Sequence, residues 1–342
     1  TAAIRGAATD NRIKALVLDV NDLAGSDLGK LESISLAIAA FKTSKKPVIA
    51  IGDNFNQGQY YLASMADKIY LNPMGSVEMQ GFSGYQTYMK DLLDQLAINV
   101  HIFRVGQFKS FVEPFMRNGM SPEARENLQQ WMDEQWLFFT QSIEQRRGLN
   151  ADAINTYINT QDQLLANEHN NPAALAKSYG LVDELATRNE AEVFIDTLTN
   201  EKPAKRIDAI TYYKQLHQLK KSSLLEKTSR IAVIQASGAI MEGDQPSGNV
   251  GAETLIEQIH RARDDEQIVA IVLRIDSPGG SAFASELIRS ELAAVQAAGK
   301  PVVASMGGVA ASGGYWIAST ADEIWASPTT ITGSIGVFGV IP

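Results

Sequence analysis

A serine inside a glycine-rich turn is the residue of this chain best suited to covalent chemistry. The stretch PVVASMGGVAASGGY (residues 301–315) begins as a short apolar run and ends in a turn that contains Ser312. Its glycines permit backbone conformations that a Cβ would forbid, so the turn could expose the Ser312 hydroxyl as a nucleophile. The stretch fits neither the G-x-S-x-G elbow nor a phosphate-binding loop. Taken alone, Ser312 is explained more simply as a small residue in a buried turn.

A second glycine-rich motif, DSPGG (residues 276–280), follows an apolar run that predicts a strand over 268–275. Consecutive glycines can aim backbone N–H groups at one point, where they would stabilise the negative charge that develops on a carbonyl oxygen during acyl transfer. A plain Pro-Gly turn explains the same letters equally well.

A serine nucleophile needs a base, and none of the four histidines lies in a glycine-rich context: His101, His169, His217 and His260. A lysine can serve if its amine is neutral, but with an ordinary pKa near 10.4 only about one lysine in a few thousand is neutral at pH 7. Burial lowers that pKa. Lys109 lies among aromatic residues in FRVGQFKSFV and is a candidate, although local context favours a surface ion pair between Lys109 and Glu113.

An internal repeat with an offset near 255 residues organises the chain. Three pairs of segments match: IKALVL with IVAIVL (13–18, 268–273), KPVIA with KPVVA (46–50, 300–304) and YYLASMADKIY with YWIASTADEIW (60–70, 315–325). Two copies of this length indicate duplication of a domain rather than a solenoid. In the first copy NDLAG stands in the place of DSPGG, and Gln57 stands in the place of Ser312. The candidate nucleophile and its candidate donors are therefore missing together from one copy.

The elements around these motifs alternate between strands and helices. We expect strands at 230–235, 268–275 and 301–304, and helices at 253–263 and 285–298. This alternation predicts an α/β fold with a parallel sheet.

A further helix is expected over residues 121–147. Ser121 and Pro122 would begin it at the N-cap and first positions, and Trp131, Trp136 and Leu137 would mark its apolar face.

We expect the first repeat with a helical extension over residues 1–218, a linker at 219–229 and the second repeat over 230–342. The second copy stops earlier than the first and ends in a strand-like run at 335–341. We therefore expect the second repeat to be incomplete and the chain to be a fragment.

Composition narrows the functional classes. The net charge is −9, so the chain lacks the excess of basic residues that is typical of nucleic-acid-binding proteins, and we expect no nucleic acid partner. There is no run of 18 apolar residues that could span a membrane and no signal-peptide pattern. The chain has no cysteine, which excludes disulfides, thiolate metal sites and a cysteine nucleophile. Nothing in the sequence calls for a metal or another cofactor.

Four motifs in family order resemble the signal peptide peptidase A (protease IV) family in its long, duplicated form. These are DSPGG (276–280), AASGGY (310–315), TGSIG (332–336) and RVGQFKSFVEPF (104–115), and the resemblance runs over nearly the whole chain. It implies two tandem ClpP/crotonase-like domains and a membrane-anchored bacterial serine peptidase. It also implies a location at the inner membrane with the catalytic domain facing the periplasm, and an assembly of identical subunits, a tetramer.

The resemblance also implies roles for individual residues. Ser312 is similar to the family's nucleophile, and Lys109 to its general base. Gly279 and Gly280 match the oxyanion-hole region, with Gly280 favoured as the direct donor, and Ser334 matches the serine that orients the lysine. The implied reaction is endopeptidase cleavage of apolar remnant signal peptides through an acyl-enzyme.

Two other functions stay open at this point. A crotonase-like enzyme that handles acyl-CoA would share the fold and the paired backbone donors, but it would not need Ser312 beside Lys109. A non-catalytic, membrane-associated scaffold is the other. The anchor that the family would carry is absent from this sequence.

Overall fold

The computed structural model describes residues 1–106, 109–200, 202–221 and 229–341. The chain divides into two compact units. Unit 1 combines Thr1–Phe82 with Gln135–Leu225, and unit 2 combines Ser83–Glu134 with Glu226–Pro342. Residues 83–134 thus group with the second half of the chain, whereas the expected boundaries kept them in the first repeat. The expected linker at 219–229 lies largely outside the described residues.

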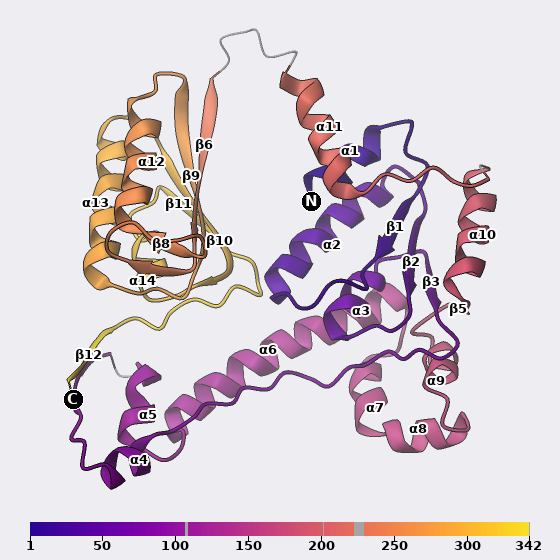
Figure 1. The fold of residues 1–342 in the computed structure, drawn as a ribbon, viewed down its shortest axis with the longest axis horizontal. Coiled ribbons are helices and arrows are strands. Elements are labelled where there is room, and N and C mark those ends of the chain that lie inside the picture. Colours follow the sequence, from indigo (N-terminus) through magenta and orange to yellow (C-terminus); the bar gives the residue numbers. More distant parts are fainter. Residues whose placement is uncertain (107–108, 201, 222–228, 342) are drawn as a thin grey trace. The chain divides into compact units, whose positions relative to one another are not determined.

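Unit 1 is built on a four-stranded parallel sheet in the order β1-β2-β3-β5 (Figure 1). Its strands are β1 (Leu16–Asp19), β2 (Val48–Gly52), β3 (Lys68–Leu71) and β5 (Glu184–Leu185). Its helices are α1 (Ala2–Thr9), α2 (Leu28–Lys42), α3 (Gln57–Ala63), α7 (Ala153–Asn159), α8 (Gln161–Asn167), α9 (Pro172–Ser178), α10 (Arg188–Thr199) and α11 (Ala209–Lys221).

Both faces of the unit 1 sheet are covered, as expected for parallel strands. One face joins the main core of the unit, in which Val48, Ala50 and Ile69 pack with residues of α2 and α3. The other face packs against α10, where Ile49 and Tyr70 are 1% and 5% exposed.

Unit 2 is built on a second four-stranded parallel sheet, in the order β11-β10-β9-β6. Its strands are β6 (Arg230–Ser237), β9 (Ile268–Ser277), β10 (Val302–Ala310) and β11 (Glu323–Trp325). Helices α12 (Ala252–Asp264) and α13 (Ala282–Ala297) lie on one side of it (Figure 1). On the other face Trp325, the repeat counterpart of Tyr70, is 64% exposed.

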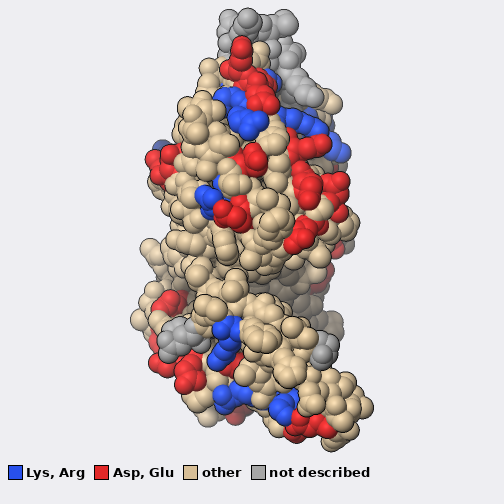
Figure 2. Space-filling model, turned by 90° about the vertical axis from the view of Figure 1, so that its left-hand side faces the viewer, with Lys and Arg blue, Asp and Glu red and all other residues tan. Residues whose placement is uncertain are grey.

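Charged side chains of both signs are interspersed in the upper half of the surface drawn in Figure 2. Several of the acidic and basic groups of α12 and α13 are paired. Glu291 accepts from His260 at 2.7 Å and lies 3.6 Å from Arg263, so it joins the two helices. Glu286 pairs with Arg289 along α13.

Shorter elements complete unit 2. Two pairs of short strands belong to this unit: a parallel pair, β7 (Ala239–Met241) with β8 (Asn249–Gly251), and an antiparallel pair, β4 (His101–Val105) with β12 (Val337–Ile341). The helical segments are α4 (Lys90–Gln95), the 3-10 helix η1 (Ser110–Val112), α5 (Glu113–Met116) and α14 (Gly313–Trp316). The long helix α6 (Pro122–Arg147) begins in unit 2 and ends in unit 1.

The residues that the repeat retains have the same structural task in both units. Lys46 donates to backbone carbonyls at the end of α1, and Lys300 donates to three carbonyls at the end of α12. Cations are favourable at this end of a helix. Asp67 accepts from the N–H that begins β2, and Asp322 accepts from the N–H that begins β10, at 2.8 and 2.7 Å. Much of the repeated sequence is therefore structural.

The expected strands and helices form, with two corrections. The strand expected at 301–304 continues through Gly307 and Gly308 to Ala310, and Gly307 packs closely on β9, since a Cβ there would lie 3.0 Å from the Ile275 carbonyl oxygen. The helix over 122–147 forms, and Trp136 packs into the core and stacks on Phe139, but Leu137 is 53% exposed while Phe139 and Ile143 are buried. No helix in the described ranges is long and apolar enough to cross a bilayer.

Candidate active site

Ser312 lies where β10 ends and α14 begins. Its backbone has φ 52° and ψ −118°, a left-handed conformation that costs a residue with a side chain on the order of 1–3 kcal/mol. Hydrogen bonds hold it there: Ser312 N–H donates to the Gly333 carbonyl at 2.8 Å, and the Ser312 carbonyl accepts from Tyr315 and Trp316. The strained turn thus presents the hydroxyl from a fixed backbone.

Lys109 reaches the same point from β4. The antiparallel ladder pairs Val105 with Val337, so the segment that leaves β4 and the segment that enters β12 lie at the same end of the ribbon. The first segment carries Lys109 and the second carries Ser334. Gly106 permits the close approach, because a Cβ there would lie 2.7 Å from the Ile335 carbonyl oxygen.

The Lys109 amine has three oxygen neighbours. Nζ lies 2.8 Å from Ser312 Oγ, 2.7 Å from the Ser334 carbonyl oxygen and 3.2 Å from Ser334 Oγ. The side chain is buried, with 5% of the residue exposed, and this burial lowers the pKa of the amine. Removal from water disfavours the charged form, so the neutral base becomes more accessible near neutral pH.

The DSPGG loop packs against the Ser312 turn. A Cβ on Gly279 would lie 2.6 Å from Gly313 N, and one on Gly280 would lie 2.0 Å from the Ile240 carbonyl oxygen. Both glycines have positive φ, at 99° and 155°. Gly279 therefore lets the DSPGG loop approach the Ser312 turn, and Gly280 lets the same loop lie against Ile240 of β7.

The N–H groups of the two glycines in the DSPGG loop differ in their hydrogen bonding. Gly279 N–H donates to Ser277 Oγ at 3.1 Å and is therefore already used. In the part of the chain that the structure describes, the N–H groups of Gly280 and Gly313 donate to no acceptor. Gly313 begins α14 directly after Ser312, and a Cβ on it would lie 3.2 Å from Gly280 N. These two free donors lie beside the candidate nucleophile.

The structure brings together Ser312, Lys109 and Ser334, with Gly279 and Gly280 against the same turn. It contradicts the ion pair between Lys109 and Glu113 that local context favoured, because the Glu113 carboxylate accepts from Ser121. Sequence reasoning missed Gly313, because its free N–H becomes apparent only once the backbone shows that α14 begins there.

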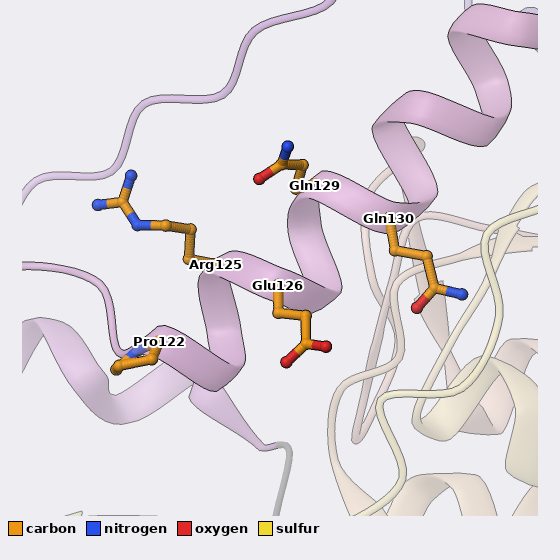
Figure 3. Close-up of a pocket in the computed structure, with 5 residues that line it drawn as sticks. All are labelled: Pro122, Arg125, Glu126, Gln129 and Gln130. Atoms are coloured by element: carbon orange, nitrogen blue, oxygen red, sulfur yellow. The ribbon is translucent and has the colours of Figure 1, made fainter.

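A shallow depression elsewhere in unit 2 does not compete with this site. It is lined by one stretch of α6: Pro122, Arg125, Glu126, Gln129 and Gln130 (Figure 3). These five side chains project from a single helix and include no hydroxyl or amine nucleophile. The candidate active site is therefore the junction of β10, β4 and the DSPGG loop.

Comparison with known proteins defines the family. The sequence pattern of Peptidase family S49 matches residues 40–200 and 294–342, and the chain belongs to this family.

Three relatives align along nearly the whole chain. Protease 4 of Haemophilus influenzae is 45% identical over 99% of this chain and 55% of its own length. Protease 4 of Salmonella typhi is 46% identical over 99% and 54%. The chloroplastic serine protease SPPA of Arabidopsis thaliana is 31% identical over 97% and 48%. The chain thus spans about half the length of these relatives.

Proposed function

We propose that this chain carries the reactive centre of a serine endopeptidase that degrades remnant signal peptides, with Ser312 as nucleophile and Lys109 as general base. The observation that carries the proposal is the contact of 2.8 Å between Lys109 Nζ and Ser312 Oγ. Ser-Lys pairs are a recognised variant of the Ser-His-Asp arrangement. Membership of Peptidase family S49 supports the same assignment.

The three neighbours of the amine match the needs of a neutral lysine. A neutral amine has two N–H donors and one lone pair. The Ser334 carbonyl can only accept, so it takes one N–H, and Ser334 Oγ can take the second. The lone pair is then left for the Ser312 hydroxyl proton. Ser334 is the orienting residue in this scheme, through its backbone as well as its side chain.

Acylation then follows the logic of covalent catalysis. Ser312 Oγ attacks the peptide carbonyl carbon as its proton passes to Lys109 Nζ. The tetrahedral intermediate breaks its C–N bond, and Lys109 gives the proton to the leaving amine. A water molecule next attacks the resulting ester, Lys109 accepts the water's proton and returns it to Ser312, and the acid product leaves.

Backbone donors stabilise the oxyanion in this scheme. The free N–H groups of Gly280 and Gly313 are our proposed pair of donors. Gly279 has a supporting role, because its own N–H is held by Ser277. A single oxyanion donor can contribute about 3–4 kcal/mol to transition-state stabilisation.

Apolar side chains next to the site support an apolar peptide substrate. Tyr315 and Trp316 follow the nucleophile and are 36% and 37% exposed, and Ile335 follows Ser334 and is 61% exposed. We propose that such surfaces receive small to medium apolar side chains of signal peptides.

The resemblance supports four further proposals. The chain acts within a membrane-anchored protein, its catalytic part faces the bacterial periplasm, and identical subunits assemble, as a tetramer. The fold is a pair of tandem ClpP/crotonase-like repeats, a proposal supported by the matching tasks of Lys46 with Lys300 and of Asp67 with Asp322. An acyl-CoA enzyme of crotonase type would not need the Ser312–Lys109 contact, so we do not prefer it.

Labelling by an alkyl fluorophosphonate tests the proposal in both this chain and the full-length protein. We expect covalent modification at Ser312, loss of labelling in Ser312→Ala and Lys109→Met, and hydrolysis of an apolar peptide ester that follows the same pattern. Ser290→Ala, an exposed serine on α13, is the matched control and retains labelling. Labelling of the full-length protein that persists in Ser312→Ala would refute the assignment.

A further inference from the structure

The segment that carries Lys109 has a second buried polar group, Glu113. Lys109, Val112 and Glu113 are spaced i, i+3 and i+4 across η1 and the start of α5, and all three are buried, at 5%, 0% and 6% exposed. This spacing places them on one face of a helical segment. The intervening Phe111 points outward, is 63% exposed and stacks on Phe338 of β12.

The Glu113 carboxylate binds the beginning of α6. Oε2 accepts from Ser121 N–H at 3.0 Å, and Oε1 accepts from the Ser121 hydroxyl at 2.5 Å. Ser121 Oγ in turn accepts from Ala124 N–H at 3.1 Å, so it caps the helix. A carboxylate is favourable at this end of a helix, where the macrodipole is positive.

Other groups around Glu113 hold the backbone of α5 in place. Its backbone carbonyl accepts from Arg117 N–H, and the neighbouring Pro114 carbonyl accepts from Met89 N–H at 2.8 Å. Tyr88 lies close enough that burial, and then the charge on Glu113, raises the pKa of its hydroxyl, while Arg117 and Arg125 act in the opposite direction.

We propose that Glu113 is a positioning residue for the general base, through a chain of contacts from the Glu113 carboxylate to the capped start of α6. The inference rests on the proposed function of Lys109. One end of the buried face reaches Ser312, and the other end is tied down by Ser121. Without this tie, the short η1–α5 segment can rotate, and Lys109 gains water and loses its alignment with Ser312.

The test measures the rate of fluorophosphonate labelling at Ser312 against pH in the full-length protein. Glu113→Gln keeps the size of the side chain but removes the charge and turns one acceptor into a donor that faces the Ser121 N–H or hydroxyl. We expect the labelling rate to fall at least about tenfold, since misplacement by an ångström can cost about a hundredfold. We also expect the rise of the rate with pH to shift to higher pH, because a hydrated Lys109 has a higher pKa.

Two further variants make the test decisive. Ser121→Ala removes only the hydroxyl contact and should shift the profile in the same direction by a smaller amount, and it replaces Glu113→Gln if that variant does not fold. Glu123→Gln, an exposed glutamate in the first turn of α6, should leave the rate and the profile unchanged.

The outcomes separate this inference from the proposed function. A wild-type protein that is not labelled at Ser312 overturns both. A labelled wild type, together with folded Glu113→Gln and Ser121→Ala variants whose pH profiles match it, overturns the role of Glu113 alone. A loss of thermal stability with an unshifted profile also overturns it, because a merely structural residue would produce that result.

Discussion

Replacing Ser334 with alanine separates two contributions of this residue to the position of the Lys109 amine. The variant removes Oγ, which lies 3.2 Å from Nζ, but keeps the backbone carbonyl at 2.7 Å. A neutral hydrogen bond contributes about 1 kcal/mol, which corresponds to about fivefold in rate. Removal of the base itself should cost about a hundredfold to ten-thousandfold. We therefore expect Ser334→Ala to be slowed about fivefold, and Lys109→Met by far more.

The assay compares initial rates of apolar peptide ester hydrolysis by the full-length protein at one pH, together with the rate of fluorophosphonate labelling. Ser334→Gly is the matched variant, because Ser334 has φ 53°, which glycine adopts without strain while it keeps the carbonyl. It should be about as active as Ser334→Ala. If Ser334→Ala instead loses as much activity as Lys109→Met, the carbonyl does not hold the amine and the reasoning is refuted.

Three other predictions concern the pH response, the glycine loop and the repeated lysine cap. Burial lowers the Lys109 pKa below its ordinary value of 10.5, so the unfolded state binds more protons at this group than the folded state does, and its contribution to the stability of the fold rises with pH. Lys109→Met removes the cost of burying this amine, so the variant should gain thermal stability, and the gain should shrink as the pH approaches 10.5. A gain that grows with pH would contradict the burial argument. Gly280→Ala puts a Cβ 2.0 Å from the Ile240 carbonyl oxygen and should abolish labelling of Ser312, whereas Gly119→Ala, with open space around its Cβ, should not. Lys300→Met should lower the free energy of unfolding by about 1–2 kcal/mol in urea titrations, with exposed Lys205→Met as the control; an equal loss in both variants would count against the cap.

Local sequence predicted most elements of the unit 2 sheet because their signal is local. Apolar β-branched runs gave β6 and β9, and amphipathic stretches gave α12 and α13. The glycines of β10 misled the prediction of where that strand ends. They suggested a turn from residue 307, but the strand continues to Ala310 with a register shift between Met306 and Ala310, and Gly307 lies close to the backbone of β9.

The candidate site was predictable only in part. The serine and the glycine loop stand out in the sequence, and their joint loss from the first copy pointed to chemistry. The contact of Lys109 with Ser312 could not be predicted from local sequence, because the two residues are 203 positions apart and the neighbours of Lys109 suggest a surface ion pair with Glu113. Family resemblance supplied that connection. The free N–H of Gly313 depends on backbone geometry that no residue type encodes.

The antiparallel ribbon of β4 and β12 explains how a lysine from the first half of the chain comes to lie beside a serine of the second. Lys109 follows β4 and Ser334 precedes β12, and the ladder that ends at Val105 and Val337 places both segments at one end. The Gly333 carbonyl, in the same segment as Ser334, accepts from Ser312 N–H and so ties the nucleophile to the ribbon. Because unit 2 contains all of these residues, the base and the nucleophile belong to one compact unit despite their separation in sequence. A break in the ribbon would therefore separate the base from the nucleophile without altering either residue.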